Sequence, residues 1–170
     1  MTIPRHLLRS TRGAAAVELA LVTPLLLILM MGSIELGNYF LDEHALVKGV
    51  RDGARYAARQ SFTNYACPGS TAPGGTVVTD TQNVVRTGQV SGGTQRLPQA
   101  GTITVMMSCN TATGGQNMLG IYRAPSGTTP YAPVVIVSAV VPYTPVMQSF
   151  GFRGTGLSLN ATQQAAVMGI

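Results

Sequence analysis

The chain has 170 residues, of which only 10% are charged, whereas soluble globular domains carry about 25%. This length allows one modest domain together with a membrane anchor. The formal net charge is +5, but the arginines after Asp80 are scattered, without interleaved aromatic residues or a helical stripe. That arrangement is typical of a solvated surface, so we expect no nucleic-acid partner.

The N-terminal part has the pattern of a membrane anchor. A leader of residues 1–13 carries three arginines and no acidic residue. The stretch 14–34 follows, and its only charge is Glu18. As a helix this stretch measures about 31 Å, enough to cross the hydrocarbon core of a bilayer. Acidic residues follow it, so the positive-inside rule predicts a cytoplasmic N-terminus and an exported C-terminal part.

Helical spacing continues beyond the predicted span, over residues 35–62. Apolar residues recur three, four or seven positions apart on one face, and arginines four positions apart mark another. The apolar positions are Leu36, Phe40, Val47, Val50, Ala54 and Ala57, and the arginines are Arg51, Arg55 and Arg59. We therefore expect one long helix from about Ala14 to Ser61, amphipathic in its second half.

Proline and glycine interrupt this helical pattern. Pro24 lacks a backbone N–H and its ring crowds the preceding turn, so we expect a helix kink there. Gly32, Gly37, Gly49 and Gly53 are either weak points of the helix or small surfaces for close packing. The spacing favours neither interpretation over the other.

A Gly/Pro-rich break opens the exported head, which we assign to residues 63–170. Its first part predicts a short helix around Thr79–Thr87. Three strands follow: residues 102–109 alternate in polarity, 131–143 is a β-branched run bounded by prolines, and 156–167 alternates at its start. We expect 131–143 to be the central or best-covered strand, and the last strand to pair antiparallel with 134–141. The predicted fold class is α+β, with a long N-terminal helix packed on a small antiparallel sheet of about three strands.

The two cysteines, Cys67 and Cys109, belong to no CxxC pair, and the only histidines, His6 and His44, lie far from both in the sequence. We therefore expect no metal site. In an exported head, one disulfide between the two is the natural pairing, and two free thiols are the alternative.

No catalytic motif stands out. The chain contains no G-x-S-x-G and no G-x-x-x-x-G-K-[ST], which argues against a nucleophile elbow and against an assembly ATPase. His44 lies beside Asp42 and Glu43 on the predicted helix, as expected for a solvated face. We expect no enzyme activity, no cofactor and no small-molecule substrate.

Glu18 is the unusual residue of the span. A carboxylate in a bilayer is costly unless it is paired, protonated or close to the interface. One interpretation is therefore functional pairing. The other is a side chain that reaches the headgroups from the first turns of the helix, where the helix dipole favours negative charge.

The order of features around Gly13 resembles the processing site of type IV pilins and pseudopilins. A basic leader precedes Gly13, and four small or apolar residues, Glu18 and an apolar helix follow it. Residues 12–60 are similar to the TadE-like family of the tight-adherence (Tad/Flp) pilus system. The motifs are Arg12–Glu18, Pro24, Glu35–Gly37 and Ala54–Ala58. The C-terminal part, residues 134–152 and 157–168, also resembles the late strands and the Pro-Tyr-x-Pro corner of that family.

This resemblance implies a minor pilin or pseudopilin of a Tad-type machine, made in the bacterial inner membrane with a periplasmic head. A prepilin peptidase would cut between Gly13 and Ala14. Glu18, then residue five of the mature chain, would pair with the N-terminal amine of another pilin-like subunit, in the membrane or in an extracellular pilus. The alternative is an unprocessed, signal-anchored envelope protein with a periplasmic ligand-binding head.

Overall fold

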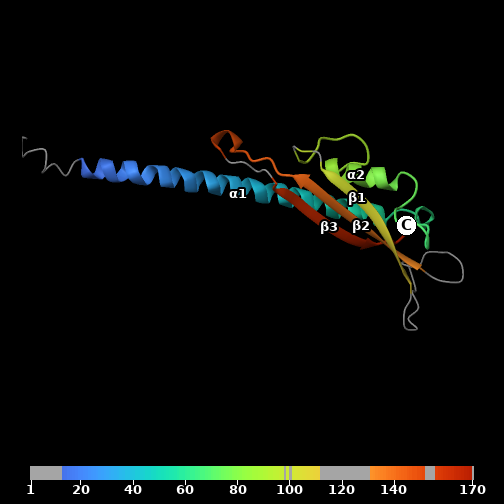
Figure 1. Ribbon diagram of the computed structural model, residues 1–170. Helices are drawn as coiled ribbons and strands as arrows, with labels where there is room; N and C mark the ends of the chain where they lie inside the picture. The colour runs from blue at the N-terminus through green and yellow to red at the C-terminus, as the bar shows by residue number, and fades with distance from the viewer. Residues whose placement is uncertain (1–12, 98, 100, 112–130, 152–155, 170) are drawn as a thin grey trace, which may run out of the picture.

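One long helix and a three-stranded sheet make up the protein in the computed structural model, which describes residues 13–97, 99, 101–111, 131–151 and 156–169. In Figure 1 the helix projects far beyond the sheet at its N-terminal end. The elements in chain order are α1 (Ala14–Ala58), η2 (Phe62–Asn64), α2 (Val77–Thr87), β1 (Thr102–Thr111), β2 (Tyr131–Pro142), η4 (Gln148–Phe150) and β3 (Ser158–Ala166). Of the basic leader, residues 1–12 lie outside the described residues.

The sheet has the order β1-β2-β3, and both pairings are antiparallel. The register places Val105 opposite Val137 and Val141 opposite Leu159. The central position of the 131–143 run and its antiparallel pairing with the last strand are therefore confirmed. The α+β fold class is confirmed as well. In a sheet of this order, strands that follow one another in the chain lie side by side, as consecutive strands commonly do.

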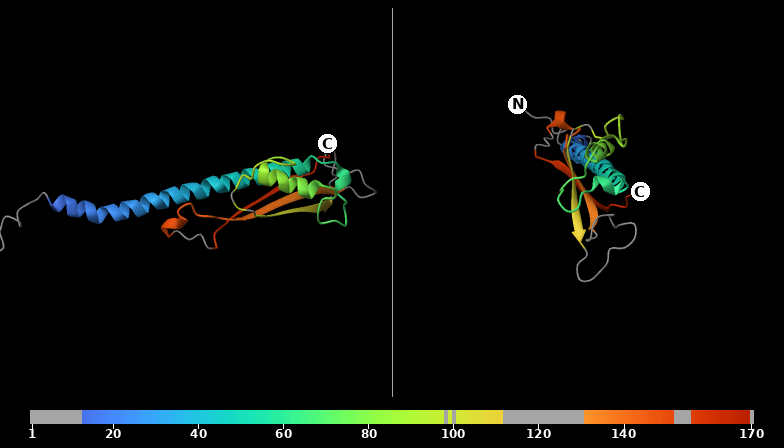
Figure 2. Two further views of the ribbon diagram at one scale, coloured as in Figure 1. Left: turned by 90° about the horizontal axis from the view of Figure 1, so that it is seen from above. Right: turned by 90° about the vertical axis from the view of Figure 1, so that its right-hand side faces the viewer.

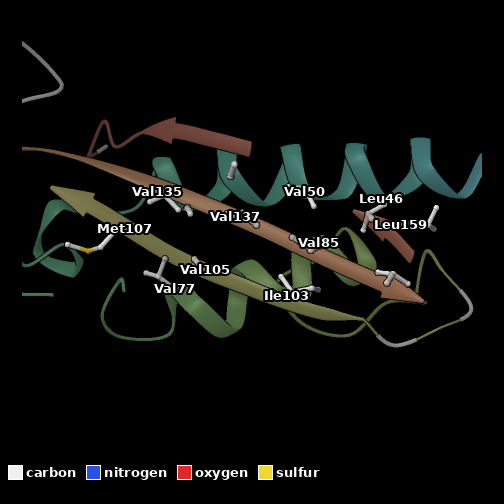
Figure 3. Packing of buried hydrophobic residues seen from close by; sticks show 14 of the residues in the cluster. Leu46, Val50, Val77, Val85, Ile103, Val105, Met107, Val135, Val137 and Leu159 are labelled. Atoms are coloured by element: carbon white, nitrogen blue, oxygen red, sulfur yellow. The ribbon is translucent and has the colours of Figure 1, made fainter. Parts of the chain in front are cut away.

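The core lies between one face of the sheet and the C-terminal half of α1, with α2 closing its side (Figure 3). Ile103, Val105 and Met107 alternate inward along β1 and are all buried, as the strand pattern predicts. From α1, Leu46, Val50 and Ala54 point into the same cluster. Burying β-branched and aliphatic side chains in this layer supplies the main favourable term in folding of the head.

The helix ends at Ala58, slightly before the predicted end near Ser61. The N–H groups of Arg59 and Gln60 donate to the carbonyls of Tyr56 and Ala57, at 3.2 and 3.0 Å. These tighter bonds close the last turn. The Ser61 side chain then accepts from the Thr63 N–H and opens η2.

The apolar face that the spacing indicates is covered by the head only in part. Leu36 and Phe40 are 55% and 51% exposed, and Val47 is only half-buried. Leu46, which the pattern did not include, takes an inner position instead. The reason is that the head covers only one side of the helix, and chiefly its second half, so spacing alone does not decide which apolar positions are covered.

The four helical glycines divide into two pairs. A Cβ at Gly49 would lie 2.6 Å from the Val85 carbonyl oxygen, and one at Gly53 would lie 2.5 Å from Val85 Cγ2. At Gly32 and Gly37 a Cβ would meet nothing within 4 Å. The first pair therefore lets α2 approach α1 closely, and the second pair faces open space.

Cys67 and Cys109 form a disulfide with a Cα–Cα distance of 5.7 Å. It joins the loop between η2 and α2 to the end of β1. In the same region the Met107 N–H donates to the Thr71 carbonyl at 2.8 Å. The disulfide and this bond hold a glycine-rich segment against β1, the edge strand, whose outer side has no strand partner among the described residues.

Candidate functional site

The N-terminal part of α1, residues 14–30, stands apart from the rest of the described protein. Figures 1 and 2 show it leaving the head as a continuous, gently curved rod. Residues 13–30 are exposed at every position, although almost all of them are apolar. By length and composition α1 can cross a membrane. An exposed apolar surface of this size indicates a binding surface for lipid or for other proteins.

Gly13 and Ala14, the predicted processing site, lie where the helix begins. Gly13 is the N-cap residue and Ala14 is the first helical residue. The Gly13 carbonyl already accepts a bond from the Val17 N–H at 3.1 Å. Both residues are exposed, and a Cβ at Gly13 would meet nothing within 4 Å. Packing against the described residues therefore does not require a glycine here.

Glu18 lies one turn further along the exposed rod. Within the described part of the chain, no hydrogen bond or ion pair joins its carboxylate to another residue. A carboxylate in an apolar helix surface without a partner in its own fold is costly to bury. The geometry thus leaves Glu18 available to a group from outside the described chain.

Pro24 lies inside α1, which continues through it. Just before it, Thr23 donates from its hydroxyl to the Leu19 carbonyl at 2.6 Å. Such bonds from Thr to the preceding turn accompany slight helix bending. The predicted kink at Pro24 stays a prediction.

Glu35, directly after the predicted span, holds the connection between β2 and β3. Its carboxylate accepts from the Tyr143 hydroxyl at 2.6 Å, and from the N–H groups of Val146 and Met147 at 3.2 and 3.0 Å. Asn38 donates to the same tyrosine hydroxyl at 3.2 Å. We call this set of contacts the Glu35 clamp. It fastens the Pro-Tyr-x-Pro corner of the head to the helix at the point where the exposed rod begins.

The clamp favours the ionised form of Glu35. Burial raises the pKa of this carboxyl, but the bonds from Tyr143, Met147 and Val146 lower it by more, so the pKa is below its ordinary value. For Tyr143 the direction is opposite. Burial, together with the bond to Glu35, raises the pKa of the phenol, although the bond from Asn38 opposes this shift.

The contact between Glu35 and Tyr143 was not predicted from the sequence. Both residues belong to motifs that were noted separately, Glu35–Gly37 and the Pro-Tyr-x-Pro corner, but they are 108 positions apart. A lone acidic residue at the end of an apolar span, and a tyrosine between two prolines, were the available signals. Nothing in their spacing shows that they meet.

The basic face of α1 agrees with the sequence pattern, because Arg51, Arg55 and Arg59 are all exposed. The neighbouring Asp52 pairs with Arg96, at 3.1 Å between carboxylate oxygen and guanidinium nitrogen. Among the described residues, no three His, Cys, Asp or Glu side chains gather in a group that could hold a metal ion.

Comparison with known proteins gives one family. The model of the TadE-like protein family matches residues 13–55, which confirms the resemblance over the helix from the predicted cut site to the basic face. The match contains Gly13, Glu18 and Glu35 and ends before the sheet. Neither a curated protein nor a solved structure matches the chain.

Proposed function

Since residues 13–55 form a TadE-like segment, which associates the chain with the Tad pilus system, we propose that it acts as a minor pilin or pseudopilin there. Its work is structural. The observation that carries this proposal is the exposed apolar rod with one carboxylate, Glu18, that has no partner among the described residues and lies five residues after Gly13.

The proposed maturation step is hydrolysis of the peptide bond between Gly13 and Ala14 by a prepilin peptidase. Water adds to the Gly13 carbonyl carbon, the C–N bond breaks, and the Ala14 nitrogen leaves as a free amine. The leader stays on the cytoplasmic side. Support comes from the position of this bond, at the exposed start of α1, where a short stretch of chain can extend into a narrow active site without disturbing the core.

The new amine gives Glu18 a counter-charge on a neighbouring subunit. Two opposite charges in a low-dielectric surrounding attract strongly, and each offsets the cost of burying the other. The head stays in the periplasm and α1 in the inner membrane until neighbouring pilin-like subunits take the helix into a fibre. The head is built around the same helix, so its position in the fibre follows from how α1 packs.

Processing is tested by the N-terminus of the purified protein. We expect it to begin at Ala14 in cells with an active prepilin peptidase and at Met1 in cells that lack the enzyme. Gly13→Leu should abolish cleavage because the side chain blocks the extended path into the enzyme. Gly37→Leu is the matched control, since a Cβ at either glycine meets nothing within 4 Å among the described residues.

A wild-type chain that keeps Met1 in the presence of the peptidase would contradict the proposal. It would favour the alternative, an unprocessed envelope protein anchored by α1. Loss of cleavage in both glycine variants would also count against it, because the effect would then be one of general helix disturbance.

A further inference from the structure

Residues 143–151, the described first part of the connection between β2 and β3, reach further along α1 toward the N-terminus than the sheet does. In Figures 1 and 2 the orange η4 turn of this segment lies beside the middle of α1. The Glu35 clamp fixes its near end through the backbone of Val146 and Met147. This part of the head is therefore held at the level where the exposed rod begins.

That level coincides with the expected membrane boundary. The hydrocarbon core accommodates residues 14–34, and the stretch 14–41 measures about 42 Å as a helix, close to the thickness of a bilayer with its headgroups. Leu36, Phe40 and Leu41 are exposed, so α1 remains apolar on its surface for about two turns beyond Ile34. Residues 35–41 then lie in the headgroup layer.

An aromatic group marks the same level. The rings of Tyr39 and Tyr143 pack edge to face with centroids 5.2 Å apart, and Tyr39 meets Phe40 in the same way at 6.0 Å. Tyrosines are enriched at membrane–water interfaces, where the ring meets acyl chains and the hydroxyl meets polar groups. Here the Tyr143 hydroxyl also donates to Glu35, which offsets the cost of a carboxylate close to lipid.

The surface that the connection presents is suited to lipid. Val146 and Leu157, at its two ends, are 58% and 54% exposed, and residues 143–157 contain no acidic side chain. Apolar side chains on a surface segment beside an anchoring helix gain free energy by entering the boundary between headgroups and acyl chains.

We propose that residues 143–151 of the β2–β3 connection form a membrane-surface contact: held by Glu35, they insert Val146 into the leaflet on the side of the head. The inference rests on the proposed anchoring of α1 in the membrane. It gives the head a second attachment to lipid, which sets the angle between the sheet and the bilayer before assembly. Extraction of the subunit into a fibre must then detach this contact as well as the helix.

The chain has no tryptophan, so a single introduced tryptophan reports on its own position. We would place Val146→Trp, Leu25→Trp and Met106→Trp in separate full-length proteins. Each is reconstituted at low density in phosphatidylcholine vesicles with and without bromine on the acyl chains. Leu25 lies in the span, and Met106 is half exposed on the sheet face turned away from the core.

We expect bromine to remove most of the emission of Leu25→Trp, part of that of Val146→Trp, and none of that of Met106→Trp. The Val146→Trp emission should also lie at shorter wavelength than that of Met106→Trp. If Leu25→Trp is quenched and Val146→Trp behaves like Met106→Trp, the membrane contact is refuted while anchoring stands. In that case the exposed side chains of Val146 and Leu157 are available to contact a neighbouring subunit instead of lipid. If Leu25→Trp is not quenched, anchoring fails and the contact with it.

Discussion

Two carboxylates on α1, Glu18 and Glu35, have opposite surroundings. Glu18 is exposed without a partner among the described residues, whereas Glu35 receives the Tyr143 hydroxyl and two backbone N–H groups. The first is therefore left available to another molecule, and the second is satisfied within the fold. Charge-assisted bonds to a carboxylate are stronger than neutral ones, so Glu35 stabilises the junction of helix and head.

Replacing Glu35 by Gln should lower the free energy of unfolding of the head by about 1 kcal/mol at pH 7, since a neutral amide cannot accept from three donors in the same way. Because the pKa of Glu35 is lowered in the fold, its contribution is fully present above the ordinary value and is lost as the pH falls through the lowered one. Thermal unfolding in detergent at several pH values would measure both effects.

The matched control for this variant is Glu43→Gln, on the same helix, where no hydrogen bond to the described chain is lost. We expect the difference between wild type and Glu35→Gln to be constant near neutral pH and to shrink below about pH 4.5, the ordinary range of a glutamate. Equal unfolding temperatures for the two variants at pH 7, or a difference that grows in acid, would contradict the clamp.

At the scale of elements, α1 is one helix with two kinds of surface. In its C-terminal half, Gly49 and Gly53 carry no side chain, which lets α2 pack closely against the helix. Its N-terminal half presents large apolar side chains outward. The sequence left two interpretations of the four helical glycines open, weak points or surfaces for close packing, and did not show which glycines serve which purpose. The division depends on where α2 lies, and that is a contact between distant segments.

Gly49→Ala should destabilise the head by about 1–3 kcal/mol, because a methyl group would be forced against the Val85 carbonyl and backbone cannot rotate away. Gly37→Ala has open space and should leave the stability unchanged or raise it by about 0.5–1 kcal/mol through helix propensity. Thermal unfolding followed by circular dichroism would compare them, and an equal effect of the two changes would refute close packing at Gly49.

The strands could be predicted because their burial repeats every two residues. The alternation of Ile103, Val105 and Met107 predicts β1, and the β-branched run between prolines predicts β2. The sequence did not show which apolar residues of α1 face the core. Leu36 and Phe40 follow the helical repeat but lie where no sheet covers them, and a repeat carries no information about what stands opposite. The Glu35 clamp could not be predicted for the same reason, because local spacing does not show that Glu35 and Tyr143 meet.

At the scale of the whole molecule, the fold separates two tasks along one helix. The head uses the C-terminal half of α1 to build its core, so the helix cannot leave the head without unfolding it. The N-terminal half contributes nothing to that core and is free to pack elsewhere (Figure 1). The whole protein is therefore arranged to present a helix, and changes in the exposed rod should affect assembly without affecting stability.

Glu18→Gln tests this separation. We expect the variant to fold with the unfolding temperature of wild type, to be cleaved after Gly13, and yet to lose most crosslinks to other pilin-like subunits in cells, because the neighbour's amine no longer finds a counter-charge. Glu43→Gln is again the control, since it removes a carboxylate from the same helix outside the rod. If Glu18→Gln assembles as well as this control, Glu18 is only an interfacial charge, and the pairing of helices must depend on apolar contact alone.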